Sequence, residues 1–140
     1  APLLKNGSDY LTTLPLIRAM ARTGLPTVLS PGMATVDEIR DAVDAFRGSE
    51  NEKLIVLHCT STYPAPDEDV NLRKIATLAA TFEALVGLSD HSSGTTAAVG
   101  AVAVDESSMA FSDWRSPSAL RRRFPTGARA DRARGRSDRS

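Results

Sequence analysis

The chain has 140 residues, an apolar content of 41%, and equal numbers of basic and acidic residues, 17 of each. Its single cysteine, Cys59, excludes an internal disulfide framework and a multi-cysteine zinc site. The sequence contains no apolar stretch of about 18 residues and no signal-peptide pattern, so we expect a cytoplasmic protein that does not span a membrane.

Three short apolar runs predict buried parallel strands, because each is too short for a helix and rich in Val, Ile and Leu. They are residues 26–29, 54–57 and 85–88, and at most a stub of strand precedes Lys5. Each of these segments ends in polar residues. In parallel α/β folds the ligand-binding and catalytic groups lie at the carboxyl ends of the strands, so the pattern predicts one functional face.

Helical patterns follow each strand. The clearest begins at Thr35, where Thr35 and Glu38 match a capping box and an apolar stripe runs to Phe46. The other three are expected around residues 14–22, 72–82 and 95–102. We expect the acidic run at residues 67–69 to lie at the N-terminus of the third helix, where the helix dipole favours anions.

This alternation of strands and helices predicts βαβ units with right-handed crossovers and an all-parallel sheet. A complete (β/α)₈ barrel typically needs about 250 residues, so four units amount to half a barrel. The alternative is a flavodoxin-like domain that binds a phosphate ligand at a switch point, although no glycine-rich phosphate loop follows any of the strands.

The composition changes at residue 105. Residues 105–140 contain nine Arg, no Lys and five acidic residues, whereas residues 1–104 contain eight basic and twelve acidic residues. The Arg run at 121–123 could bind nucleic acid, but only Phe124 is close enough to stack on a base, so we expect no nucleic-acid partner. We predict a disordered Arg-rich tail over 105–140; out-of-frame translation of a GC-rich gene would give the same composition.

Four polar motifs, taken together and in this order, resemble the sialic acid synthase family. They are Lys5-Asn-Gly-Ser8, Leu29-Ser30-Pro-Gly-Met-Ala-Thr35, His58-Cys-Thr-Ser-Thr-Tyr-Pro-Ala-Pro66 with Asp69-Val-Asn-Leu72, and Gly87-Leu-Ser-Asp-His91. Four motifs at consistent spacing are far more specific than any one of them. The resemblance covers residues 3 to 104 and implies strands four to seven of a TIM barrel.

The resemblance also implies an activity. Members of this family condense phosphoenolpyruvate with an open-chain N-acetylmannosamine-like sugar, release phosphate, and use a divalent metal, Mn²⁺ or Mg²⁺. The matching positions imply Tyr63 as a catalytic residue, His91 as a metal ligand with Asp90 behind it, and substrate-binding roles for Lys5, Ser8, Ser30, Ser61 and Ser89. A lysine supplies a compact charge for the phosphate or carboxylate, and hydroxyl groups supply orientable hydrogen bonds. The family is homodimeric.

The sequence departs from the family pattern at three points, of which the first two are tolerable. Asn6 stands where the family has an apolar residue, and Pro31 replaces a threonine and removes a backbone donor. More seriously, the family has a second metal-binding histidine in an eighth strand, and this chain has no histidine after His91. We therefore expect the polypeptide to be inactive alone; the alternative functions are a noncatalytic fragment or an Arg-tailed binding module.

Some of these residues also have a purely structural explanation. Lys5 could be a solvated surface lysine, and Ser30 and Ser61 could be loop or helix-cap residues. We expect His58 to be buried and satisfied by a backbone partner, because an imidazole at a strand end needs only one. We expect Cys59 to be a small core residue, since no nearby base is visible that would activate its thiol.

Overall fold

The computed structural model describes residues 2–104 and 109–112. The described elements in chain order are β1 (Leu4–Asn6), η1 (Ser8–Tyr10), α1 (Leu14–Arg22), β2 (Thr27–Leu29), α2 (Val36–Arg47), β3 (Leu54–Cys59), η2 (Asp67–Asp69), α3 (Arg73–Phe82), β4 (Leu85–Asp90), α4 (Thr96–Val104) and β5 (Met109–Ser112). Within this part of the chain, no helix is long and apolar enough to cross a bilayer.

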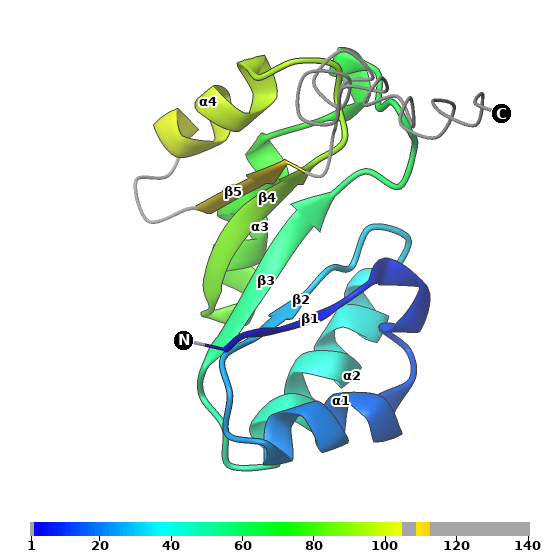
Figure 1. The fold of residues 1–140 in the computed structure, drawn as a ribbon, viewed down its shortest axis with the longest axis vertical. Coiled ribbons are helices and arrows are strands. Elements are labelled where there is room, and N and C mark those ends of the chain that lie inside the picture. The colour runs from blue at the N-terminus through cyan, green and yellow to red at the C-terminus, as the bar shows by residue number, and fades with distance from the viewer. Residues whose placement is uncertain (1, 105–108, 113–140) are drawn as a thin grey trace, which may run out of the picture.

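The described strands form one parallel sheet in the order β1-β2-β3-β4-β5, so each strand pairs with the next one along the chain (Figure 1). A doubly wound fold reverses its strand order at the switch point, whereas a barrel adds strands in sequence. The flavodoxin-like alternative is therefore wrong for the described residues. The observed order is that of consecutive units of a (β/α)₈ barrel.

The three predicted strands are confirmed, and two of them are longer than predicted. Pairing between β3 and β4 continues through His58 with Leu88 and Cys59 with Ser89. The sequence prediction ended these strands at their last apolar residue. Backbone hydrogen bonds form the ladder between β3 and β4, so it does not stop where the side chains become polar. The polar side chains at its end are buried.

The capping box of α2 is confirmed. Thr35 Oγ1 accepts a hydrogen bond from the Glu38 backbone N–H at 3.3 Å. The Glu38 carboxylate in turn accepts from the Thr35 backbone N–H at 2.7 Å and from its hydroxyl at 3.0 Å. These hydrogen bonds hold the pKa of Glu38 below its usual value. They satisfy backbone donors that the first turn of a helix leaves unpaired.

The predicted position of the acidic run is wrong. Asp67 to Asp69 form the separate 3₁₀ turn η2, and α3 begins only at Arg73, with no acidic residue in its first turn. Asn71 has a φ of 40°, which interrupts the helical path between the two elements. The acidic side chains therefore lie before the interruption and do not interact with the helix dipole at the N-terminus of α3.

The predicted disordered tail needs one correction. Met109–Ser112 form strand β5, four residues that pair in parallel with Gly87 to Asp90 of β4. The sequence prediction ended the periodic pattern at Val104, but β4 offers unpaired backbone groups along its edge, and a short apolar segment can pair with them. The remainder of the predicted tail lies outside the described residues.

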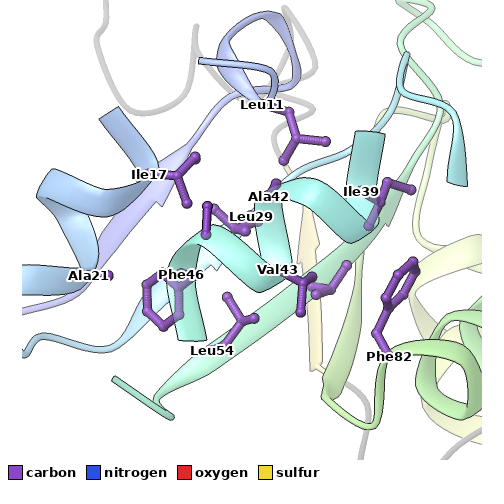
Figure 2. Close-up of a cluster of buried hydrophobic side chains, with 12 residues drawn as sticks. Leu11, Ile17, Ala21, Leu29, Ile39, Ala42, Val43, Phe46, Leu54 and Phe82 are labelled. Atoms are coloured by element: carbon purple, nitrogen blue, oxygen red, sulfur yellow. The ribbon is translucent and has the colours of Figure 1, made fainter. Parts of the chain in front are cut away.

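The core lies between the sheet and the helices that cover one of its faces. Figure 2 shows the larger cluster, in which Phe46 of α2, Ile17 of α1 and Leu29 of β2 meet. A second cluster joins α3 and α4 to β4. We call this side of the sheet the helix face; its core-facing strand residues are Leu29, Leu54, Val56, Val86 and Leu88.

Successive side chains of a strand point to opposite faces of the sheet. Asn6 pairs with Leu29, His58 pairs with Leu88, and Asp90 follows Leu88 by two residues, so these three side chains share the helix face. Lys5 and Ser89 alternate with them and lie on the opposite face, which we call the inner face.

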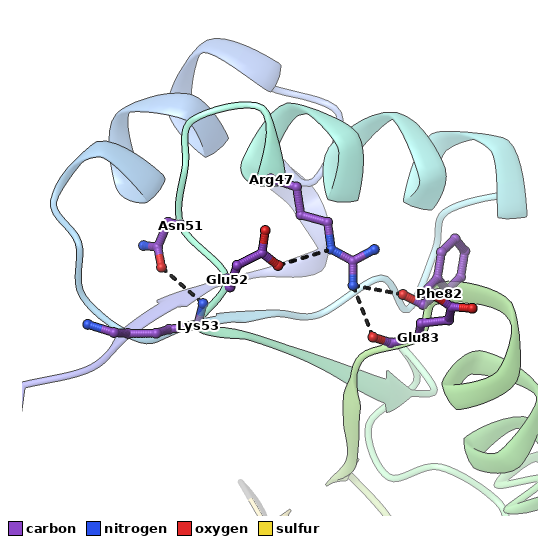
Figure 3. Close-up of polar contacts among 6 residues, drawn as sticks. All are labelled: Arg47, Asn51, Glu52, Lys53, Phe82 and Glu83. Carbon is purple, nitrogen blue, oxygen red and sulfur yellow. Dashed lines mark hydrogen bonds and ion pairs between the residues drawn. The ribbon is translucent and has the colours of Figure 1, made fainter.

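Arg47 connects the ends of two helices (Figure 3). Its Nη2 donates to the backbone carbonyl oxygens of Phe82 at 2.9 Å and Glu83 at 3.0 Å, and its Nε lies 3.9 Å from a Glu52 carboxylate oxygen. Glu83 ends α3 in the left-handed conformation with a φ of 47°. The guanidinium of Arg47 thus satisfies carbonyl groups that the end of α3 leaves unpaired.

Replacing Arg47 with Ala should lower the free energy of unfolding by about 1 to 2 kcal/mol, because two charge-assisted hydrogen bonds are lost. The matched control is Glu52→Ala, which removes only an exposed ion pair and should cost less than about 0.5 kcal/mol. Urea unfolding followed by circular dichroism measures both values. Equal values for the two variants would contradict the assigned role of Arg47.

Candidate functional site

The predicted site residues lie at one edge of the sheet, where the carboxyl ends of four parallel strands meet. Lys5 lies in β1 and Ser89 in β4. Ser8 begins η1, Ser30 directly follows β2, and the remaining three, Ser61, Tyr63 and His91, follow β3 or β4. The shared edge is a consequence of the parallel strand order.

Two loops meet at this edge. The Ser8 and Ser61 hydroxyl oxygens are 3.3 Å apart, although the residues are 53 positions apart in the chain. Gly32 makes the approach of a third loop possible: a Cβ on Gly32 would overlap Ser61 Oγ and lie 2.7 Å from Cys59 Sγ. The absence of a side chain at position 32 therefore allows the segment after Ser30 to pack against the end of β3.

His91 is held by the segment that follows β3. Its Nδ1 lies 2.7 Å from the Thr60 carbonyl oxygen, and its own carbonyl oxygen accepts from the Ala65 backbone N–H at 2.9 Å. A carbonyl oxygen only accepts hydrogen bonds, so Nδ1 carries the proton. In the neutral ring, Nε2 is then the acceptor.

The Nε2 atom of His91 has two hydroxyl neighbours. Tyr63 Oη lies 2.9 Å away and Ser89 Oγ lies 3.3 Å away. The Tyr63 ring also stacks on the imidazole, with centroids 4.1 Å apart and an interplanar angle of 27°. His91 is buried, whereas the Tyr63 side chain is 65% exposed. The structure therefore brings together three of the predicted residues, Tyr63, Ser89 and His91.

Ser30 and Lys5 are placed differently. Ser30 is only 4% exposed, and its hydroxyl oxygen has no hydrogen-bond partner among the described residues. Lys5 is exposed on the inner face and pairs with Val28, two residues before Ser30. A buried hydroxyl without a partner is uncommon in folded proteins because its desolvation is not compensated.

Two further residues at the same edge have unpartnered buried atoms in the described part of the chain, Asn6 Oδ1 and Asp90 Oδ2. Asn6 was not predicted as a site residue, although an amide in a short apolar strand was the signal that could have identified it. The predicted role of Asp90 behind His91 is not what the structure shows. Asp90 Oδ1 instead accepts from the backbone N–H of Ser92 at 2.9 Å and from its hydroxyl at 2.7 Å.

Asp90 points away from His91 because of strand alternation. Its side chain shares the helix face with Leu88, and the turn after β4 brings Ser92 back to it. The carboxylate fixes that turn by a local side-chain to backbone contact. The Asp90 carboxylate thus fixes the turn that follows His91, whereas the Nδ1 atom of the imidazole contacts the Thr60 carbonyl oxygen.

The suitability of this edge for a divalent metal rests on His91. A metal-binding histidine usually donates its other ring N–H to a carbonyl or carboxylate, and the contact from Nδ1 to Thr60 is of this kind. The described residues contain no group of three or more His, Cys, Asp or Glu side chains that could hold an ion. His91 could therefore serve as one ligand of such an ion.

His58 and Cys59 lie in the core, as predicted. His58 is buried, and its Nε2 lies 2.6 Å from the Val70 carbonyl oxygen. Burial lowers the pKa of His58, the hydrogen bond to Val70 opposes this shift, and the positive charge of Lys74 adds to it. Cys59 is buried as well.

Sequence and structure comparisons assign the chain to a family. A family model described as the NeuB family matches residues 1–106. The N,N'-diacetyllegionaminic acid synthase of Legionella pneumophila is 41% identical over 95 residues, 65% of this chain and 27% of that enzyme. The N-acetylneuraminic acid synthetase of Leptospira borgpetersenii superposes with a TM-score of 0.73 at 36% identity, covering 79% of this chain and 38% of that chain.

A more distant comparison concerns the fold alone. A truncated 3-deoxy-D-arabino-heptulosonate 7-phosphate synthase from Thermotoga maritima has a TM-score of 0.67 at 16% identity, covering 80% of this chain and 46% of that one. The sheet and its polar edge define a parallel α/β protein of the barrel type. The chain belongs to the NeuB family, which confirms the resemblance to the sialic acid synthases. It spans well under half the length of the relatives described here.

The lowered pKa of His58 predicts how stability depends on pH. The unfolded state takes up the proton first, so the contribution of neutral His58 is complete above the ordinary histidine value of about 6.5. It is lost as the pH falls through that value toward the lower folded-state pKa. The variant His58→Gln keeps a donor for the Val70 carbonyl but cannot titrate.

Urea midpoints measured at several pH values between 8 and 5 should therefore fall more steeply for the wild-type protein than for His58→Gln. Carboxylates contribute to both proteins alike, so the difference isolates His58. Parallel midpoint curves over this range would show that His58 is not a neutral buried group.

Proposed function

We propose that this chain supplies part of the active site of a synthase that condenses phosphoenolpyruvate with an N-acetylmannosamine-like sugar in carbohydrate biosynthesis. Membership of the NeuB family supports the reaction class. The observation that carries the proposal is the buried Ser30 hydroxyl, which has no hydrogen-bond partner among the described residues and lies at the edge where Lys5 and three further serines lie.

Phosphoenolpyruvate carries a phosphate and a carboxylate, and the edge offers groups suited to both. Lys5 would supply a positive charge to one anionic group. The Ser30 hydroxyl would gain the hydrogen bond that it lacks in the described protein. The Ser8 and Ser61 hydroxyls, 3.3 Å apart, would exchange their mutual contact for bonds to anion oxygens.

His91 and Tyr63 would act on the sugar substrate. His91 Nε2 would be one ligand of a Mn²⁺ or Mg²⁺ ion, which in this family polarises the sugar aldehyde as a Lewis acid. The Thr60 carbonyl would keep the proton on Nδ1 and hold the ring in place. Tyr63 is largely exposed, so its hydroxyl could leave Nε2 and orient a sugar hydroxyl or a water molecule while its ring remains stacked on His91.

The bond changes define what these residues must orient. The methylene carbon of phosphoenolpyruvate forms a bond to the aldehyde carbon of the open-chain sugar, and the aldehyde oxygen takes up a proton to become a hydroxyl. Water adds to the carbon that bears the phosphate and loses its protons, and the bond from that carbon to the phosphate oxygen breaks, which releases phosphate and leaves a 2-keto group. Lys5 and the serine hydroxyls would hold the phosphate and carboxylate during this attack. Their rigid placement at strand ends limits the reorganisation that the reaction requires.

The sugar and the assembly are further parts of the proposal. The two related synthases described above carry the names of different acids, so we specify the acceptor only as N-acetylmannosamine-like. We also propose that the working enzyme is a homodimer. The 140-residue polypeptide alone should not catalyse the condensation, since it has no histidine after His91 to match the second metal-binding histidine of the family.

Replacing Lys5 with Ala should weaken phosphoenolpyruvate binding by about tenfold or more, because an anionic group loses its cationic partner. Isothermal titration of the 140-residue chain measures the dissociation constant. The matched control is Lys53→Ala, at the opposite end of the sheet, where the ammonium donates to the Gly24 carbonyl oxygen at 3.1 Å.

The control should bind phosphoenolpyruvate as the wild-type chain does, and circular dichroism should show that both variants fold. Equal affinity in the wild-type and Lys5→Ala chains would remove Lys5 from the site. Equal weakening in both lysine variants would mean that binding depends on overall charge alone, which would also contradict the proposal.

A further inference from the structure

We propose that the space between α2 and α3 is a second binding site, which takes a small apolar carboxylate carrying a hydroxyl or amino donor. This site lies on the helix face of the sheet, whereas Lys5 and Ser89 lie on the inner face. Its volume is 240 Å³. Ligand sites commonly measure about 300 to 1,000 Å³, so the ligand is a small molecule.

The cavity has an apolar wall with polar groups at a few points. Aliphatic and ring carbon atoms come from Pro31, Ala34, Val36, Ile39 and Leu78. The polar side chains come from His58 of β3 and from Lys74 and Thr77 of α3, and Cys59 at the end of β3 also lines the cavity. A mostly apolar cavity with a few convergent polar groups is the usual composition of a small-molecule site.

His58 is the buried polar group of this cavity. It is only 4% exposed, and its Nε2 contacts the Val70 carbonyl oxygen. Since a carbonyl only accepts, Nε2 carries the proton and Nδ1 of the neutral ring is an acceptor. Among the described residues, the hydrogen bond of the His58 ring is the one from Nε2 to Val70, so Nδ1 can accept a hydrogen bond from a ligand hydroxyl or amino group.

Lys74 determines the charge of the ligand. Its side chain lines the same cavity, and it is close enough to His58 to disfavour protonation of the imidazole. The lining residues include no Asp or Glu that would neutralise Lys74 within the cavity. An ammonium group beside an aliphatic wall favours a ligand whose carboxylate is attached to an apolar group. The neutral His58 adds no further charge to the cavity.

The position of the cavity links it to the loops of the strand edge. Pro31 and Gly32 line it and directly follow Ser30, and Cys59 lines it two residues before Ser61. The binding inference itself does not depend on the proposed synthase activity, because it rests on the cavity, His58 and Lys74 alone.

Mandelate is a suitable probe, because it joins a carboxylate and a hydroxyl to a small apolar ring. Two analogues separate the contributions: phenylacetate lacks the hydroxyl, and mandelamide lacks the negative charge. Binding to the ¹⁵N-labelled 140-residue chain is followed by NMR titration. Mandelate should shift the amide signals of Thr77 and Leu78, and both analogues should bind at least about threefold more weakly.

The decisive variant is Lys74→Met, which keeps an extended apolar side chain at an exposed helix position. It should weaken mandelate binding by about tenfold, whereas the matched control Lys53→Met should leave it unchanged. Ala34→Leu, which fills the cavity, should also prevent binding.

Three results would overturn the inference. They are the absence of saturable mandelate binding to the folded wild-type chain, equal affinity in the wild-type and Lys74→Met chains, and shifts confined to the strand edge around Ser30 and Ser89. The last result would place the carboxylate in the proposed phosphoenolpyruvate site and not between α2 and α3.

Discussion

The parallel register of β1 to β4 is the constraint on which the candidate site depends. It brings the carboxyl ends of the strands to one edge and decides which side chains share a face. Lys5 pairs with Val28, and Cys59 pairs with Ser89, so the lysine and the serine lie on the inner face. A slip of one residue in β4 would place Asp90 there instead of Ser89, because side-chain direction alternates along a strand.

Contacts between loops position the remaining side chains of the candidate site. The segment after β3 holds His91 through the Thr60 carbonyl and the Ala65 N–H, and it carries Tyr63 onto the imidazole. Gly32 allows the β2 loop to approach Ser61. Backbone contacts thus fix the hydroxyl and imidazole groups. Their arrangement forms without a bound ligand.

Local patterns in the sequence were sufficient to predict most of the helices and strands. Thr35 and Glu38 predicted the start of α2, and the apolar runs predicted β2, β3 and β4, because capping and burial are determined by neighbouring residues. The strand ends and β5 could not be predicted in this way, since the ladder partner of a segment such as 109–112 is distant in sequence. Asp90 was misassigned because its orientation depends on strand alternation and on the turn to Ser92.

The central claim is that the carboxyl edge of this sheet binds phosphoenolpyruvate. The most direct measurement is an NMR titration of the ¹⁵N-labelled chain with phosphoenolpyruvate, followed at every assigned backbone amide. The account predicts saturable shifts concentrated at Gly7, Ser8, Ser30, Ser61 and Ser89. Shifts concentrated at the opposite ends of the strands, around Pro26 and Lys53, or no saturable shifts in the folded chain, would contradict it.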